Sequence, residues 1–127
     1  MPRPEIWVVE DNDHNFELLE FLLADAGYEV TRARDGVEFT RLLRGPAPAL
    51  ILLDMSLPAT TGLDLVREVR GLERFRAVPV VAVTAHAMRG DRERFLEAGC
   101  DGYVSKPIEA ESFLAEVARH AGRGGVP

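Results

Sequence analysis

The sequence predicts an α/β fold: a five-stranded parallel sheet, doubly wound, with helices on both faces in a three-layer sandwich. Along the 127 residues, five short apolar runs alternate with amphipathic stretches, which is the pattern of successive βαβ units. The first, third and fourth runs are almost continuously apolar, as expected for parallel strands that are covered on both faces. The length corresponds to one domain and is sufficient to bury a real core.

Each expected strand coincides with one of these apolar runs: Ile6–Val9, Glu29–Ala33, Leu50–Leu53, Val80–Val83 and Gly102–Val104. The second and fifth runs alternate between apolar and polar residues, which suits the edges of a sheet. The first helix ends before Gly27, which provides a C-terminal stop. The later helices are expected at residues 36–43, 62–72, 91–98 and 110–121.

The fourth helix, the last helix and the C-terminal residues carry further expectations. The helix at residues 91–98 is weakly patterned, and a solvated surface helix is favoured over a loosely anchored, movable one. His120 is expected on the surface of the last helix. We expect the domain to span residues 1–121, and the glycine-rich residues 122–127 to form a flexible tail or the stub of a linker.

Charge and composition exclude several classes of protein. The net charge is -6, which argues against nucleic-acid binding because a phosphate backbone demands a basic protein face. No segment approaches the roughly 20 apolar residues that span a bilayer, so no membrane contact is expected. Cys100 is the single cysteine, which excludes an internal disulfide bond and a CxxC metal site and fits a reducing compartment. Residues 1–3 lead straight into a strand without an apparent signal peptide, which favours the cytoplasm.

Acidic residues and a lysine follow the predicted strands. Glu10 and Asp11 come after the first strand, Asp54 after the third and Lys106 after the fifth. Ligands of parallel α/β sheets bind at the carboxyl ends of the strands. Three carboxylates brought together there repel one another unless protons or a cation compensate, and Mg²⁺ is the natural cation for such ligands. The lysine can neutralise the carboxylates at rest and later bind phosphoryl oxygens.

Each of these features also has a purely structural explanation. An acidic pair after a strand can serve as a helix N-cap, a role that Asp13 fills equally well. Thr84 and Ala85 end the fourth strand, where the hydroxyl can donate to a phosphoryl oxygen or the threonine can simply be a β-branched strand residue or a helix cap. Lys106 precedes Pro107, which favours extended backbone and ends the strand, and a Lys–Pro peptide bond can be cis.

Taken in order, Glu10-Asp11, Asp54, Thr84-Ala85 and Lys106-Pro107 resemble the motifs of the receiver domain of bacterial response regulators, which has the CheY-like, flavodoxin-like fold. The resemblance covers nearly the whole chain, and it is specific because several strand ends match together. Residues 80–91 and 99–108 look particularly like the stand-alone DivK-type regulators. A single-domain regulator is therefore expected. Because similar receivers also occur within hybrid histidine kinases, the alternative is a receiver excised from a hybrid kinase or a larger regulator.

The resemblance implies a function in a two-component system or phosphorelay. Asp54 would accept a phosphoryl group from a phosphohistidine on a histidine kinase or a phosphotransfer protein, and an aspartyl phosphate would form. Mg²⁺, with Mn²⁺ as an alternative, would be bound directly by Asp11 and Asp54, through water by Glu10, and by the backbone carbonyl of Ser56. The other phosphoryl oxygens would be held by three groups: Lys106, Thr84 and the backbone amide of Ala85.

The resemblance also implies a conformational output. Thr84 would move toward the phosphoryl group and Tyr103 would turn inward, whereas the alternative for Tyr103 is an edge-strand aromatic that covers the core. Asn15 and Phe16 would contact the phosphodonor protein. The face formed by the fourth helix, the fifth strand and the last helix would contact an unknown downstream protein. The chain would be a monomer, or a weak dimer through this face.

We therefore expect a signalling phosphoacceptor. Such a protein catalyses only its own phosphorylation and dephosphorylation. Two alternatives from other classes are open. A small Mg²⁺-dependent phosphohydrolase with an aspartyl-phosphate intermediate usually carries a second aspartate two residues after the nucleophile, where this chain has Ser56. A flavodoxin-like binding module needs a phosphate-cradling loop rich in Ser, Thr or Gly. The loop here is Glu10–Asp13, which repels phosphate unless a metal is bound.

Overall fold

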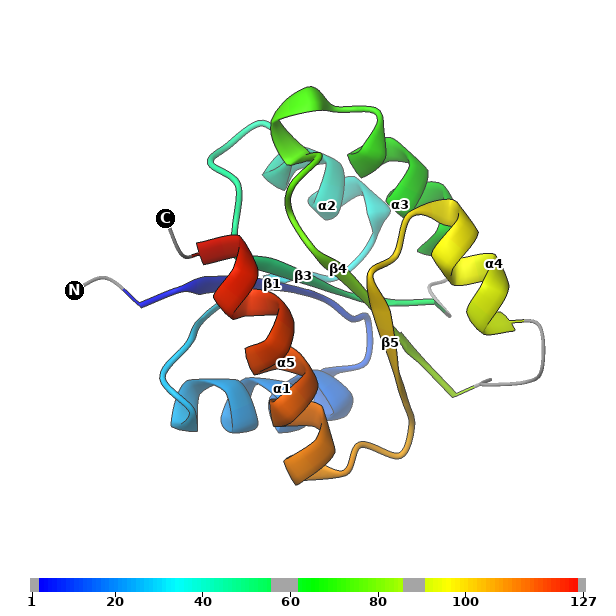
Figure 1. The fold of residues 1–127 in the computed structure, drawn as a ribbon. Helices are drawn as coiled ribbons and strands as arrows, with labels where there is room; N and C mark the ends of the chain where they lie inside the picture. Colours follow the sequence, from blue (N-terminus) through cyan, green and yellow to red (C-terminus); the bar gives the residue numbers. More distant parts are fainter. Residues whose placement is uncertain (1–2, 56–61, 86–90, 126–127) are drawn as a thin grey trace.

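A computed structural model describes residues 3–55, 62–85 and 91–125 of the chain (Figure 1). Five parallel strands form one sheet in the order β2-β1-β3-β4-β5, so the predicted fold class and both predicted edge strands are confirmed. Every strand lies within one residue of its predicted position. The strands are β1 (Glu5–Val9), β2 (Glu29–Ala33), β3 (Leu50–Asp54), β4 (Val80–Thr84) and β5 (Gly102–Ser105).

The predicted helices are all present, and α2 and α3 end one and two residues before their predicted ends. Two larger differences occur. A short 3-10 helix, η1, was not expected, and α5 continues four residues beyond its predicted end because backbone hydrogen bonding does not need the apolar repeat to continue. Across the described ranges, no helix has the length and apolar character that crossing a membrane requires. The helices are α1 (Asp13–Asp25), α2 (Gly36–Leu42), α3 (Gly62–Arg70), η1 (Glu73–Phe75), α4 (Asp91–Ala98) and α5 (Ala110–Gly125).

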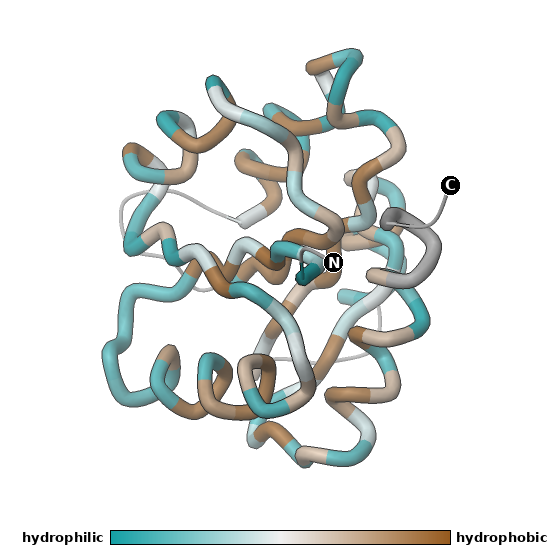
Figure 2. Tube along the Cα trace, turned by 90° about the vertical axis from the view of Figure 1, so that its left-hand side faces the viewer, coloured by the Kyte–Doolittle hydropathy of each residue, from teal (hydrophilic) through white to brown (hydrophobic). Residues whose placement is uncertain are grey.

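The sheet separates two hydrophobic cores. Alternate residues of a strand point to opposite faces, so Ile6 and Val8 of β1 face one core while Trp7 and Val9 face the other. α1 and α5 cover the first face, and α2, α3 and α4 cover the second (Figure 1). Hydrophobic and hydrophilic residues alternate along the helices (Figure 2), because each helix buries one side and exposes the other.

The helix α4 is the surface helix that its weak pattern predicted. Phe95 is its one buried residue, at 7% exposure. Its C-terminal end is held by Arg70, whose guanidinium donates to the carbonyl of Gly99 at 2.9 Å and to the carboxylate of Asp101 at 2.8 Å. The same guanidinium donates to three backbone carbonyls between α3 and β4. Arg70 therefore ties the segment before β4 to the segment before β5.

The expectation for His120 was wrong, because its side chain is buried. The residue is 2% exposed, and its Nε2 lies 3.0 Å from Oε2 of Glu116 on the same helix. The ring fits because position 102 of β5 is a glycine: a Cβ on Gly102 would lie 2.9 Å from Nε2 of His120 and 2.5 Å from Oε2 of Glu116. A histidine therefore packs against β5 where the sequence pattern suggests a solvent-exposed position.

Candidate functional site

Four of the functional residues predicted from the sequence meet at the carboxyl edge of the sheet. Glu10 directly follows β1, Asp54 ends β3, Thr84 ends β4 and Lys106 directly follows β5. The Nζ of Lys106 lies 3.5 Å from Oε1 of Glu10 and 3.5 Å from Oδ2 of Asp54. The backbone N–H of Lys106 donates to the carbonyl of Thr84 at 2.8 Å, which extends the β4–β5 pairing into the site. The Lys106–Pro107 peptide bond is cis.

The acidic cluster is buried on one side and exposed on the other. Glu10 is 1% exposed and Asp54 is 3% exposed, whereas Asp11 lies on the surface. One carboxylate oxygen from each of these three residues lies within 4.8 Å of the other two. The fold thus brings together three carboxylates that the sequence places at the ends of two separate strands.

Desolvation dominates the electrostatics of Glu10. Burial raises the pKa of Glu10 from 4.5 to about 7, and the negative charge of Asp54 together with a hydrogen bond between the two side chains acts in the same direction. The backbone N–H of Asn12, which donates to Oε2 of Glu10 at 3.2 Å, and the ammonium of Lys106 both favour the charged form. The pKa is raised because these two contacts do not outweigh the loss of water and the repulsion between the acids.

Oxygen atoms at this spacing fit a Mg²⁺ ion. In an octahedron with Mg–O distances of about 2.0–2.1 Å, adjacent ligands lie about 3 Å apart and opposite ligands about 4 Å apart. The oxygens of Glu10, Asp11 and Asp54 lie within 4.8 Å of one another, so small movements or a bridging water bring them to these separations. A cation would also replace the proton that burial favours on Glu10. The fourth predicted ligand, the carbonyl of Ser56, lies outside the described residues.

The other predicted residues of the site lie around this cluster. Thr84 is 2% exposed, and Ala85 follows it on the surface, immediately after β4. Tyr103 of β5 is half-buried against the core that α4 covers, and the guanidinium of Arg92 lies 5.7 Å from the centroid of its ring. Tyr103 also borders a pocket of about 440 Å³ between α4, β5 and α5. Both predicted roles of Tyr103, a switch and a cover of the core, fit this position.

The two predicted partner residues lie in the first turn of α1. The backbone N–H of Asn15 donates to Oδ1 of Asn12 at 2.8 Å, which is the N-cap bond of the helix. Phe16 is half-buried, and the guanidinium of Arg32 lies 4.5 Å from the centroid of its ring. The sequence pattern did not single out Arg32. The available signal was a charged residue one position before the end of β2, the strand that pairs with β1.

Known proteins with similar sequences point to one family. Residues 6–118 match the response regulator receiver domain. The polar-differentiation response regulator DivK of Brucella anthropi is 40% identical over 122 residues, which cover 96% of this chain and 98% of that relative. The DivK of Brucella ovis is 41% identical over 117 residues, which cover 92% of this chain and 95% of that relative.

Solved structures agree with the sequence relatives. The receiver domain of a sensor histidine kinase from Pseudomonas aeruginosa PAO1, which has a magnesium ion coordinated in its active-site cleft, matches with a TM-score of 0.86 and 38% identity over 94% of this chain and 98% of that chain. A putative response regulator from Chloroflexus aurantiacus matches with a TM-score of 0.90 and 30% identity, over 95% and 99%. The resemblance noted in the sequence is confirmed, and the chain belongs to the response regulator receiver domain family.

Proposed function

We propose that this receiver domain is a phosphoacceptor of a two-component system or phosphorelay, and that Asp54 accepts the phosphoryl group with the help of Mg²⁺. One observation carries the proposal: two buried carboxyl groups, Glu10 and Asp54, share the ammonium of Lys106 at 3.5 Å each, beside the exposed carboxylate of Asp11. In the sheet, β3 with Asp54 lies between β1 with the other acids and β4 with Thr84. Asp54 thus lies between the groups suited to a metal and the groups suited to phosphoryl oxygens.

The transfer follows from this arrangement. A carboxylate oxygen of Asp54 forms a bond to phosphorus while the P–N bond to the donor histidine breaks, and the bonding electrons leave with the imidazole. Lys106 pairs with one oxygen of the transferred group, and the hydroxyl of Thr84 and the N–H of Ala85 donate to others. Mg²⁺, when bound, neutralises part of the negative charge on the phosphoryl oxygens. The chain's own contribution is to position these groups and to exclude water from the inner side of the site.

The three acids have different roles toward the metal in this proposal. Asp11 and Asp54 would bind the ion directly, and the carbonyl of Ser56, which lies outside the described residues, would be a further ligand. Glu10 would act through a water molecule, because its Oε2 already accepts the bond from the N–H of Asn12 and its Oε1 lies 3.5 Å from the Nζ of Lys106. The magnesium in the cleft of the Pseudomonas relative supports the choice of ion. Mn²⁺ prefers the same oxygen ligands and is the alternative ion.

The proposed phosphodonor is a histidine kinase or a histidine phosphotransfer protein that contacts α1 near Asn15 and Phe16. A pocket of about 140 Å³ next to Asn15 supports this placement, because it joins an apolar surface of α1 to the charged site. Four apolar residues line the pocket together with the site residues Glu10 and Lys106; they are Leu18, Leu19, Pro107 and Ile108. Such a mixed lining suits a partner side chain that approaches beside the phosphohistidine.

The proposed output is a rearrangement of Thr84 and Tyr103 after phosphorylation. Tyr103 borders the pocket between α4, β5 and α5, so a new position of its ring would change the face that a downstream protein, or a second copy in a weak dimer, contacts. We place the protein in the cytoplasm, with self-catalysed phosphorylation and dephosphorylation as its only chemistry. The phosphohydrolase alternative finds no support in the family match or in the relatives.

Intact-mass analysis after incubation with acetyl phosphate tests the proposal. The wild type should gain one phosphoryl group with Mg²⁺ and none without it, and Asp54→Ala should gain none. Asp25→Ala is the matched control, because it removes an exposed aspartate at the far end of α1 and should be phosphorylated like the wild type. A wild type that stays unmodified although it binds Mg²⁺, or an Asp54→Ala variant that is modified to the same extent, would overturn the assignment.

A further inference from the structure

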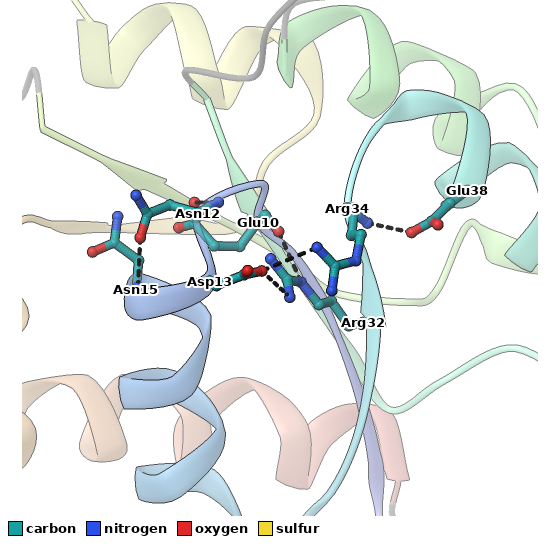
Figure 3. Close-up of polar contacts among 7 residues, drawn as sticks. All are labelled: Glu10, Asn12, Asp13, Asn15, Arg32, Arg34 and Glu38. Carbon is teal, nitrogen blue, oxygen red and sulfur yellow. Dashed lines mark hydrogen bonds and ion pairs between the residues drawn. The ribbon is translucent and has the colours of Figure 1, made fainter.

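Arg32 of β2 connects the acidic loop with the start of α1 (Figure 3). Its Nε donates to the backbone carbonyl of Glu10 at 3.1 Å, and its Nη1 donates to Oδ1 of Asp13 at 2.8 Å. Its guanidinium also lies over the ring of Phe16, 4.5 Å from the centroid. One side chain therefore holds both ends of the short segment that carries Asp11.

Surface ion pairing does not account for this arginine. The side chain of Arg32 is 14% exposed, against 57% for Arg34, which also contacts Asp13, at 3.0 Å. The Nη2 of Arg32 is buried and has no hydrogen-bond partner within the described part of the chain. A buried donor without a partner lowers the stability of the fold. The ion pair with Asp13 alone therefore does not explain why an arginine is buried at this position.

The backbone of Glu10 is held from two sides. Its N–H donates to the carbonyl of Ala33 at 3.0 Å, and its carbonyl accepts the bond from Arg32. That carbonyl belongs to the same planar peptide unit as the N–H of Asp11. The bond from Arg32 therefore sets the orientation of the backbone from which the Asp11 side chain extends.

We propose that Arg32 is a positioning residue for the metal site. By holding the carbonyl of Glu10 and the carboxylate of Asp13 at once, it keeps the carboxylate of Asp11 within reach of Asp54. The inference rests on the proposed function, in which Asp11 and Asp54 bind Mg²⁺. Removing a group that orients metal ligands without touching the metal commonly changes metal affinity by about 10–100-fold.

Charge and positioning predict opposite effects of removing Arg32. The guanidinium is a cation near a cation-binding site, so loss of its charge alone would strengthen Mg²⁺ binding. Loss of positioning would weaken it. Arg34 supplies the matched control, because it has the same charge and shares Asp13, while its guanidinium bonds to Asp13 and not to Glu10 among the described residues.

The experiment measures the Mg²⁺ affinity of the full chain by isothermal titration calorimetry, at a temperature at which circular dichroism shows each variant folded. Arg32→Gln should bind Mg²⁺ about tenfold more weakly than the wild type. Arg34→Gln should bind with the wild-type affinity or more tightly. Arg32→Lys should recover part of the affinity, because an ammonium reaches one of the two acceptors.

Wild-type or tighter Mg²⁺ binding by Arg32→Gln would overturn the inference. If Arg32→Gln does not fold, Arg32→Lys decides, and wild-type affinity in that variant would overturn the inference in the same way. Failure of the proposed function has a different signature, since the wild type itself would then bind no Mg²⁺ or remain unphosphorylated. A wild type that binds Mg²⁺ and is phosphorylated on Asp54, beside an unaffected Arg32→Gln, would refute only the role of Arg32.

Discussion

The metal-free protein should lose stability between about pH 5.5 and pH 8 because Glu10 gives up its proton. Burial raises the pKa of Glu10 from 4.5 to about 7, so the folded protein binds this proton more tightly than the unfolded chain does. The resulting stabilisation is complete below about pH 4.5 and is lost as the pH rises through about 7. One pKa unit corresponds to about 1.4 kcal/mol, and the part lost in this pH range is about 2 kcal/mol of unfolding free energy.

Urea unfolding at the two pH values, followed by circular dichroism, measures this loss. Glutamine has the shape of the protonated acid and does not titrate. Between about pH 5.5 and pH 8 the unfolding free energy of Glu10→Gln should therefore fall by about 2 kcal/mol less than that of the wild type. Mg²⁺ should stabilise the wild type more at about pH 8 than at about pH 5.5, because the ion replaces the proton. At ten times its dissociation constant the ion should add about 1.4 kcal/mol.

A wild-type stability that stays constant over this range would refute the reasoning, as would an equal decline in Glu10→Gln, because Glu10 would then not be the titrating group. Two other carboxylates with shifted pKa values do not contribute to the stability change between about pH 5.5 and pH 8. The bond from Arg32 lowers the pKa of Asp13, and the bond from Ser112 lowers the pKa of Glu109. The stability that these two acids contribute is therefore lost only as the pH falls below their ordinary values of 3.8 and 4.5.

Three further predictions concern the support of α4, the packing of α5 and the lysine of the site. Arg70→Ala should lower the unfolding free energy in urea by about 2–4 kcal/mol, because it removes part-buried hydrogen bonds to several backbone carbonyls. Arg67→Ala, on the exposed side of α3, should change it by less than about 0.5 kcal/mol. Equal changes in the unfolding free energy of Arg70→Ala and Arg67→Ala would contradict the supporting role of Arg70. Gly102→Ala should lower the thermal midpoint in calorimetry, since its Cβ would lie 2.9 Å from the buried ring of His120, and an unchanged midpoint would show that α5 adapts freely. Lys106→Met should slow phosphorylation by acetyl phosphate by about 100-fold, measured as initial rates by intact mass, and should leave Mg²⁺ binding intact or tighter; a wild-type rate would exclude its proposed role.

The fold class and the strand positions could be predicted because buried strands have a recognisable pattern of apolar residues in the local sequence. The uninterrupted apolar run at residues 50–53 and the alternating run at residues 29–33 distinguish a central strand from an edge strand. The residue that follows each run then lies at a strand end, and a parallel sheet brings all carboxyl ends to one edge. For this reason Glu10, Asp54 and Lys106 could be expected together before any contact was known.

Contacts between segments that are distant in the sequence produce no such local pattern. Arg32 has no periodic signal, and its bond to the carbonyl of Glu10 exists because β2 pairs with β1. His120 resembles a polar surface residue of an amphipathic helix, and it is buried because Gly102 on β5 leaves room for its ring. Both features depend on a second element that lies far away in the sequence.

The sequence by itself determined the α/β fold, the strand ends and the kinds of chemical group that these ends present. The tertiary structure decided how deeply each group is buried, which raises the pKa of Glu10 to about 7, and which side chains hold the acidic loop in place. The physical reason is that a local pattern records which residues avoid water. Desolvation, charge repulsion and hydrogen bonding depend on distances between elements that meet only in the folded chain.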